Sequence, residues 1–154
     1  MTRRTILPLA ALVLALLLAA VALSACGGSS TPSDVATALK DNDQVSQYSD
    51  AFAAAGISGN GPYTVVAATN DALTKAGVKL DSDAVKASVI QGTDVTKADA
   101  VKGAKWDAML PNNTIYSYTG TDGQLYVNSY KVVGDPITTG NGTVYIVDGV
   151  IQPK

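Results

Sequence analysis

The 154-residue chain contains no histidine and no glutamate, and its single cysteine is Cys26. Histidine is the commonest general base and metal ligand in proteins, so both roles lose their usual residue. One cysteine cannot close a disulfide within the chain. A hydroxyl such as that of Ser88 has no imidazole to activate it as a nucleophile. We therefore expect no enzyme, no metal site and no cofactor.

Positive charge is also scarce in this chain. Arg3 and Arg4 are its two arginines, and both lie near the N-terminus. From Cys26 onward, nine lysines face thirteen aspartates, which gives a formal charge of −4. Binding of nucleic acid needs a basic patch or stripe, so we expect no nucleic-acid partner. The same 129 residues suffice for one domain with a hydrophobic core.

The N-terminus has the anatomy of a signal peptide, because Arg3 and Arg4 precede an apolar run over residues 6–22. The sequence Leu-Ser-Ala-Cys that ends at Cys26 resembles a bacterial lipobox. This resemblance implies cleavage before Cys26 and acylation of that residue. An uncleaved transmembrane anchor over residues 6–25 and a secreted protein with a free thiol are the alternatives. The lipoprotein interpretation is favoured, because it explains why the one cysteine stands at the end of this motif.

On this interpretation the chain has three parts. Residues 1–25 are a lipoprotein signal peptide, residues 26–34 are a flexible tether of small and polar residues, and residues 35–154 form a single domain. Lipidated Cys26 would hold the domain at the bacterial cell membrane, in an extracytoplasmic location.

Helix signals dominate the first two thirds of the domain. We expect a short helix capped by Ser33, and then an amphipathic helix that ends near Gly56. A strand over residues 63–67 should run directly into a helix that Thr69 and the two polar residues after it can cap. Two further helices are expected, one running from Asp81 to Gly92 with Val85 and Val89 on one face, and one after the capping box Thr96–Asp99.

After Pro111 the pattern changes to alternation of apolar and polar residues. We expect strands over residues 114–119 and 124–127, joined by a Gly-Thr-Asp-Gly turn, and further strands over 131–133 and 143–151. Trp106, Met109 and Leu110 are assigned to the core. Helices followed by strands indicate an α+β domain with a largely antiparallel sheet.

Two segments resemble the signatures of fasciclin-like (FAS1) domains. Residues 61–73 read Gly-Pro-Tyr-Thr-Val-Val-Ala-Ala-Thr-Asn-Asp-Ala-Leu, and the family pattern is approximately Gly-Pro-Phe-Thr-Val-Phe-Ala-Pro-Thr-Asn-x-Ala-Phe. Residues 141–153 read Asn-Gly-Thr-Val-Tyr-Ile-Val-Asp-Gly-Val-Ile-Gln-Pro, against roughly Asn-Gly-Val-Ile-His-Val-Ile-Asp-x-Val-Leu-x-Pro. The resemblance covers about residues 35–153. It implies a wedge-shaped β-sandwich with several short helices packed on it.

The chain departs from that family where animal members carry adhesion residues. The Tyr-His pair between the two signatures is replaced by Ala87 and Ser88. The Asp-Ile pair linked to integrin binding is split by a proline, as Asp135, Pro136 and Ile137. Animal-type adhesion therefore does not transfer with the fold.

The candidate site residues are the polar positions of the two signatures. We expect them to be structural and to bind strand ends and helix caps through backbone hydrogen bonds. They are Thr69, Asn70, Asp71, Asn141 and Asp148. Asp41 and Asp43 have the spacing of a calcium loop, but the chain lacks the glutamate that such a loop requires.

Two functions remain open at this point. The first is a membrane-anchored surface lipoprotein for non-enzymatic adhesion or for cell-envelope or matrix interaction. The second is a tethered module that binds a small molecule, such as a lipid or pigment, with the tyrosine-rich C-terminal sheet as its walls. The partners are then the membrane, through lipidated Cys26, and an unknown protein, glycan or small molecule. A deep apolar pocket would favour the second function, and an exposed aromatic patch would favour the first.

Overall fold

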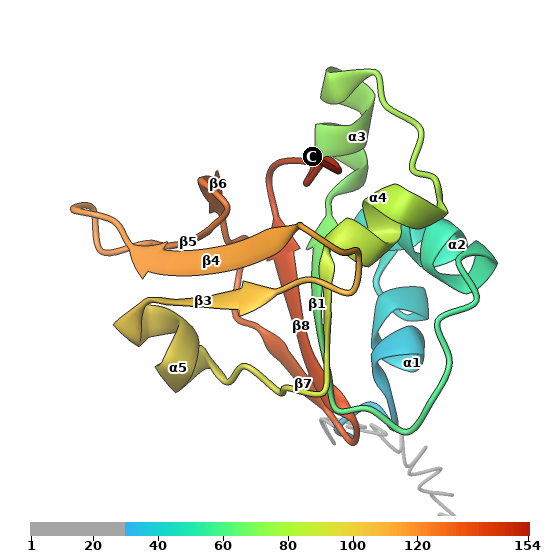
Figure 1. The fold of residues 1–154 in the computed structure, drawn as a ribbon, viewed down its shortest axis with the longest axis horizontal. Coiled ribbons are helices and arrows are strands. Elements are labelled where there is room, and N and C mark those ends of the chain that lie inside the picture. The colour runs from blue at the N-terminus through green and yellow to red at the C-terminus, as the bar shows by residue number, and fades with distance from the viewer. Residues whose placement is uncertain (1–29) are drawn as a thin grey trace, which may run out of the picture.

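The computed structural model describes residues 30–154, and two four-stranded sheets with short helices make up this part of the chain (Figure 1). The helices are α1 (Val35–Lys40), the 3₁₀ helix η1 (Asp43–Val45), α2 (Ser46–Ala54), α3 (Asn70–Ala76), α4 (Ser82–Ala87) and α5 (Lys97–Lys102). The strands are β1 (Tyr63–Ala68), β2 (Val89–Gln91), β3 (Ala104–Asp107), β4 (Thr114–Thr119), β5 (Leu125–Val127), β6 (Tyr130–Lys131), β7 (Ile137–Thr139) and β8 (Gly142–Val147). The first sheet has the order β2-β1-β8-β7 and the second has the order β3-β4-β5-β6.

The two signature segments form the centre of the first sheet. β1 and β8 lie side by side in parallel, with Tyr63 opposite Gly142 and Ala68 opposite Val147. All six residues of each strand are buried. Strands covered on both faces are rich in apolar residues, and both segments are so apart from the buried Thr64 and Thr143. The two segments that resemble fasciclin signatures therefore share one β core.

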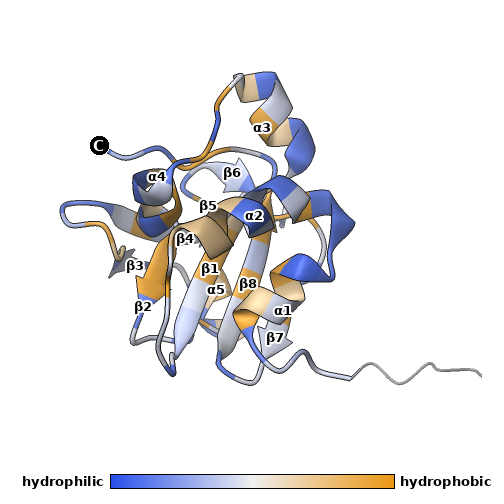
Figure 2. Ribbon diagram, turned by 90° about the vertical axis from the view of Figure 1, so that its right-hand side faces the viewer, coloured by the Kyte–Doolittle hydropathy of each residue, from blue (hydrophilic) through white to orange (hydrophobic). Residues whose placement is uncertain are grey.

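Alternate residues of these strands face two different hydrophobic clusters. Val65 and Val144 join a cluster with α1, α2 and α4, whereas Val66 and Tyr145 join a cluster with the second sheet. In the view of Figure 2, α1 and α2 lie in front of β1 and β8. In Figure 1 the strands of the second sheet lie on the opposite side and run across β8. The first sheet is therefore the middle layer of the domain.

The helix caps are decided by local side chains. The side chains of Thr69, Asp81 and Thr96 cap α3, α4 and α5 by accepting hydrogen bonds from backbone N–H groups, as expected. The cap of α1 is Asp34 rather than the expected Ser33, and Asp34 Oδ1 accepts from the Thr37 N–H at 2.7 Å. This hydrogen bond holds the pKa of Asp34 below its usual value.

Contact between the N-terminal segment and the domain begins before α1. The Gly140 N–H donates to the carbonyl oxygen of Pro32 at 3.0 Å. The Val35 N–H donates to Asn141 Oδ1 at 2.9 Å. The chain therefore joins the domain beside the N-terminal end of β8.

Several strand boundaries differ from the sequence-based expectation. The helix after Asp81 ends at Ala87, and Val89 lies instead in β2, which pairs antiparallel with β1. β3 and β7 were not expected as strands, and Trp106 lies within β3. The last strand ends at Val147 rather than at residue 151. Val89 is drawn into a strand by pairing with β1, and β3 and β7 pair with β4 and β8, so these strands depend on partners that the periodicity of a single segment does not contain.

The parallel pairing of β1 and β8 is the outstanding feature that the sequence analysis did not predict. Within residues 30–154 the other strand pairs are antiparallel, in agreement with the expected sheet. Parallel neighbours require a long crossover, and here the whole stretch between the two signatures serves as that connection.

The close approach of β1 and β8 predicts a sharp stability difference between two glycine variants. A Cβ added at Gly142 would lie 1.8 Å from the carbonyl oxygen of Tyr63, a backbone atom of the paired strand. Gly142→Ala should therefore lower the free energy of unfolding by about 3 kcal/mol or more. Gly134 also has a positive φ, +73°, but open space around it, so Gly134→Ala should cost about 1–2 kcal/mol. Urea unfolding of both variants measures the difference, and equal losses would contradict the described strand contact.

Candidate functional site

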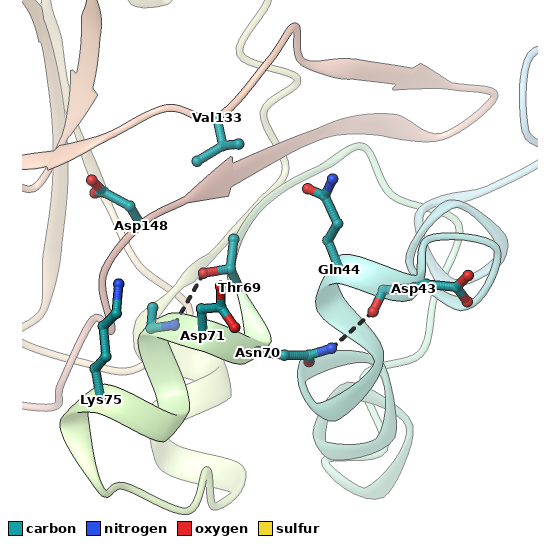
Figure 3. Close-up of a pocket in the computed structure, with 9 residues that line it drawn as sticks. Asp43, Gln44, Thr69, Asn70, Asp71, Lys75, Val133 and Asp148 are labelled. Atoms are coloured by element: carbon teal, nitrogen blue, oxygen red, sulfur yellow. Dashed lines mark hydrogen bonds between the residues drawn. The ribbon is translucent and has the colours of Figure 1, made fainter.

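An open groove of about 570 Å³ lies at the C-terminal ends of β1 and β8 (Figure 3). Because the two strands are parallel, the residues that follow them meet at one edge of the sheet. Most of the residues that line this groove have polar side chains. The lining residues are Asp43, Gln44, Thr69, Asn70, Asp71, Ala72, Lys75, Val133 and Asp148. Four of the five polar signature residues therefore line one groove.

Asn70 joins three segments beside this groove. Its Oδ1 accepts a hydrogen bond from the Gln47 N–H at 3.0 Å. Its Nδ2 donates to the carbonyl oxygen of Asp43 at 2.8 Å and to Ser46 Oγ at 3.0 Å. The side chain thus holds η1 and the start of α2 against the start of α3.

The side chains of Thr69 and Asp148 also accept hydrogen bonds from backbone groups. Thr69 Oγ1 accepts from the Ala72 N–H at 3.1 Å, which caps α3. Asp148 Oδ1 accepts from the Lys131 N–H at 2.8 Å, and the Asp148 N–H donates to the Lys131 carbonyl at 3.1 Å. Asp148 therefore ties the end of β8 to β6 of the second sheet.

Asp71 and Lys75 contribute charges at the two ends of α3. Both side chains are exposed, and among residues 30–154 neither has an ion-pair or hydrogen-bond partner through its side chain. Figure 3 shows Lys75 and Asp148 on one side of the groove and Asp43 and Gln44 on the other. The charges of Asp71 and Lys75 are available to a binding partner.

Asn141, the fifth signature residue, lies at the opposite end of the strand pair. Its Oδ1 accepts hydrogen bonds from the Val35 N–H and from Thr139 Oγ1. Its carbonyl oxygen accepts from the Tyr63 N–H at 2.9 Å. Asn141 thus connects α1, β7 and the start of β1, far from the groove.

The model of the Fasciclin domain family matches residues 32–153. The chain belongs to this family. Fasciclin domains are associated with adhesion and with extracellular matrix interaction. No curated protein sequence matches the chain significantly.

A solved structure with the same fold is a FAS1 domain pair from the insect cell adhesion molecule fasciclin I. The TM-score is 0.62 at 11% sequence identity, and the match covers 79% of this chain. The chain corresponds to about half, 52%, of that structure. At this identity the likeness concerns the fold alone.

The interior of this fasciclin domain has little free space between its sheets. An apolar void lined by residues such as Val66, Ile115 and Tyr145 measures about 10 Å³, roughly the room of one water molecule. Tyr116, Tyr118 and Tyr126 of the second sheet do not line this void, whereas Tyr130 on β6 lines an open hollow beside Gly149. Ile115 and Ser117 face inward on β4, so the alternating residues Tyr116 and Tyr118 face solvent. The alternation of apolar and polar residues along residues 114–119 was the sequence signal that could have predicted the exposure of Tyr116 and Tyr118.

The hydroxyl of Ser88 belongs to a hydrogen-bonded contact in the core rather than to a surface site. Ser88 is buried, its Oγ lies 2.6 Å from Tyr48 Oη, and it donates to the Val85 carbonyl at 2.8 Å. Burial raises the pKa of Tyr48, which favours its neutral hydroxyl form. Between residues 30 and 154 no cluster of three or more metal-ligating side chains occurs. In the same range no helix has both the length and the apolar character needed to cross a membrane.

The contacts of Asn70 predict a difference between two neighbouring residues of the fasciclin signature. Asn70→Ala removes three hydrogen bonds between helices and should lower the free energy of unfolding by about 1–2 kcal/mol. Asp71→Ala is the matched control and should change it by no more than about 0.5 kcal/mol, because that side chain is exposed and unbonded. Urea denaturation followed by circular dichroism compares them. Equal midpoints would show that Asn70 does not hold η1 and α2 to α3.

Proposed function

We propose that this fasciclin domain is a surface-anchored, non-enzymatic adhesion module that binds a component of the cell envelope or of an extracellular matrix. Lipidated Cys26, which lies outside the described residues, would tether it to the outer side of the bacterial membrane. A chain that lacks histidine and glutamate and commits its only cysteine to lipid has few catalytic groups left.

The observation that carries this proposal is the contrast between a filled interior and open outer surfaces. The void between the sheets is about 10 Å³, whereas a small-molecule site usually has a volume of hundreds of cubic ångströms. The larger openings lie outside, above all the groove of about 570 Å³. Open, shallow surfaces suit a macromolecule better than an enclosed ligand.

The orientation of the domain also supports adhesion. The chain joins the domain at Pro32, beside the N-terminal end of β8, whereas Asp71 and Asp148 lie beyond the C-terminal ends of β1 and β8. A six-residue strand is about 20 Å long, so a membrane tether and the groove would lie at opposite ends of the sheet. The groove would then point away from the membrane.

A polar small molecule is the second candidate, and the volume of the groove favours it. About 570 Å³ lies within the usual range for ligand sites. The lining is open and charged, with Asp71, Lys75 and Asp148 around Val133, so it suits a polar compound rather than a lipid or pigment. Native mass spectrometry of the chain from its own source separates the two: an apo mass supports adhesion, and a co-purifying compound supports the second candidate.

Adhesion is tested with beads that carry the full chain. Such beads should remain on envelope fragments or matrix of the source cells after washing, at several times the level of uncoated beads. Beads coated with the heat-denatured chain control for non-specific protein adsorption. Retention no greater than that of the denatured control would overturn the proposed function.

The anchor is tested by Cys26→Ser in the bacterial source. This variant should lose labelling by an alkyne fatty acid and leave the membrane fraction or accumulate unprocessed, because the acyl chains supply the membrane affinity. Ser29→Ala is the matched control and should keep both the label and the membrane fraction. Unchanged acylation of Cys26→Ser would refute lipid attachment at this residue.

A further inference from the structure

The second sheet ends at β3, and within residues 30–154 no strand pairs with the outer edge of β3 (Figure 1). Three of the four residues of this strand, Ala104, Lys105 and Asp107, are exposed. A strand at the edge of a sheet presents unpaired backbone N–H and C=O groups, with which another strand can pair. The edge of β3 is therefore a candidate surface for a partner.

The other three edge strands are covered or protected. On β2 the carbonyl oxygen of Val89 accepts a hydrogen bond from the Met109 N–H at 2.7 Å. On β6 the backbone of Lys131 forms two hydrogen bonds with Asp148. Pro136 directly precedes β7, and proline at an edge opposes the addition of a strand. Among residues 30–154, β3 is the edge strand that has neither a covering segment nor a neighbouring proline.

The register of β3 shows which of its backbone groups point outward. Directly after the strand, the Ala108 N–H donates to the Asn113 carbonyl at 3.0 Å. Hydrogen-bonded and non-hydrogen-bonded pairs alternate along an antiparallel ladder, so Trp106 bonds to β4 and its two neighbours do not. The N–H and C=O groups of Lys105 and Asp107 therefore face the open edge. No backbone hydrogen bond within residues 30–154 uses these four groups.

The four groups match those of a second copy of the chain. When two β3 strands lie antiparallel with Trp106 opposite Trp106 of the second copy, Lys105 of each chain lies opposite Asp107 of the other. Both residues direct their backbone groups outward, so each Lys105–Asp107 pair exchanges two hydrogen bonds. The strand is thus self-complementary about a two-fold axis at Trp106.

The side chains fit the same register. Lys105 and Asp107 lie on one face of β3, and neither forms an ion pair within residues 30–154. Lysine at an edge normally opposes strand addition. In the two-fold register, however, each Lys105 lies directly across from an Asp107, and opposite charges in that position favour pairing. On the other face, partly exposed Trp106 takes a non-hydrogen-bonded position, where cross-strand side chains lie closest.

We propose that the chain forms a two-fold symmetric dimer in which β3 pairs antiparallel with β3 of a second copy. The two four-stranded sheets then become one continuous sheet. The alternation of backbone groups and the order of the two charges carry this inference, because both fit a second copy in one register. The inference goes beyond the proposed adhesion function and does not depend on it.

The expected dimer is weak. β3 has four residues, so the interface is small, and we expect a dissociation constant on the order of 100 µM. Copies held on one membrane have a raised effective concentration. The test therefore uses the full chain in its bacterial source.

Cysteine cross-linking tests the register. In the proposed pairing Ala104 lies opposite Ala108 of the second copy, with the two Cα atoms about 4.5 Å apart, which a disulfide can span. Ala104→Cys and Ala108→Cys chains, carrying different tags, are produced together or singly and treated with a mild oxidant. The mixture should give a disulfide-linked heterodimer about tenfold above either variant alone, because identical positions in the two copies lie about 13 Å apart. The unaltered chain, with Cys26 alone, gives the background.

Charge reversal is the matched control for this pairing. Lys105→Asp or Asp107→Lys, placed in both cross-linking chains, sets like charges opposite each other and should lower the yield about tenfold. Combining the two changes in both chains restores opposite charges and should restore the yield. A mixture of one chain with Lys105→Asp and one with Asp107→Lys should also cross-link. Recovery in these two cases would show that the single changes disturb pairing rather than folding.

Several outcomes overturn the proposal. One is a yield from the mixture no higher than that of the single variants, and another is a yield that neither charge reversal lowers. Cross-linking of either cysteine variant to a different protein, without the heterodimer, assigns the edge to another partner and also overturns it. Bead adhesion is measured separately. Beads that adhere without cross-linking leave the proposed function standing, and cross-linked chains whose beads do not adhere leave the dimer standing and refute adhesion.

Discussion

The parallel pairing of β1 with β8 is the contact on which the rest of the domain depends. Each strand is buried over its whole length, with helices on one face and the second sheet on the other. Gly142 permits the strands to approach at the start of this pairing, where a side chain would meet the backbone of Tyr63. The hydrophobic clusters on the two faces could not form without this shared middle layer. The two family signatures thus correspond to two paired strands that are buried on both faces, together with the turns that flank these strands.

The same pairing divides the polar signature residues by position. Residues that follow the strands gather at the groove, and Asn141, which precedes β8, lies at the other end beside Val35. Most of these side chains hydrogen-bond to backbone groups and join separate segments, as buried or partly buried polar groups must. Asp148 joins the two sheets in this way through Lys131. What remains for recognition is on the surface: the charges of Asp71 and Lys75, and the exposed rings of Tyr116 and Tyr118.

Local signals in the sequence predicted local structure well. The caps at Thr69, Asp81 and Thr96 follow from one side chain and an N–H group three residues further on, so a short window contains the whole interaction. Val89 shows the opposite case. Its spacing from Val85 fits a helix, but pairing with Val65 of β1 places it in a strand, and that partner is 24 residues away. The short strands β3 and β7 likewise depend on partners rather than on their own pattern.

The sequence by itself determined the family, the two central strands and the alternation along β4 that puts Tyr116 and Tyr118 on one side. Tertiary structure alone decided that this side faces solvent, and that Tyr126 and Lys131 from later strands continue the row. Periodicity states which residues share a face, because side chains alternate along a strand. It does not state what covers that face, since covering depends on contacts between segments far apart in the chain.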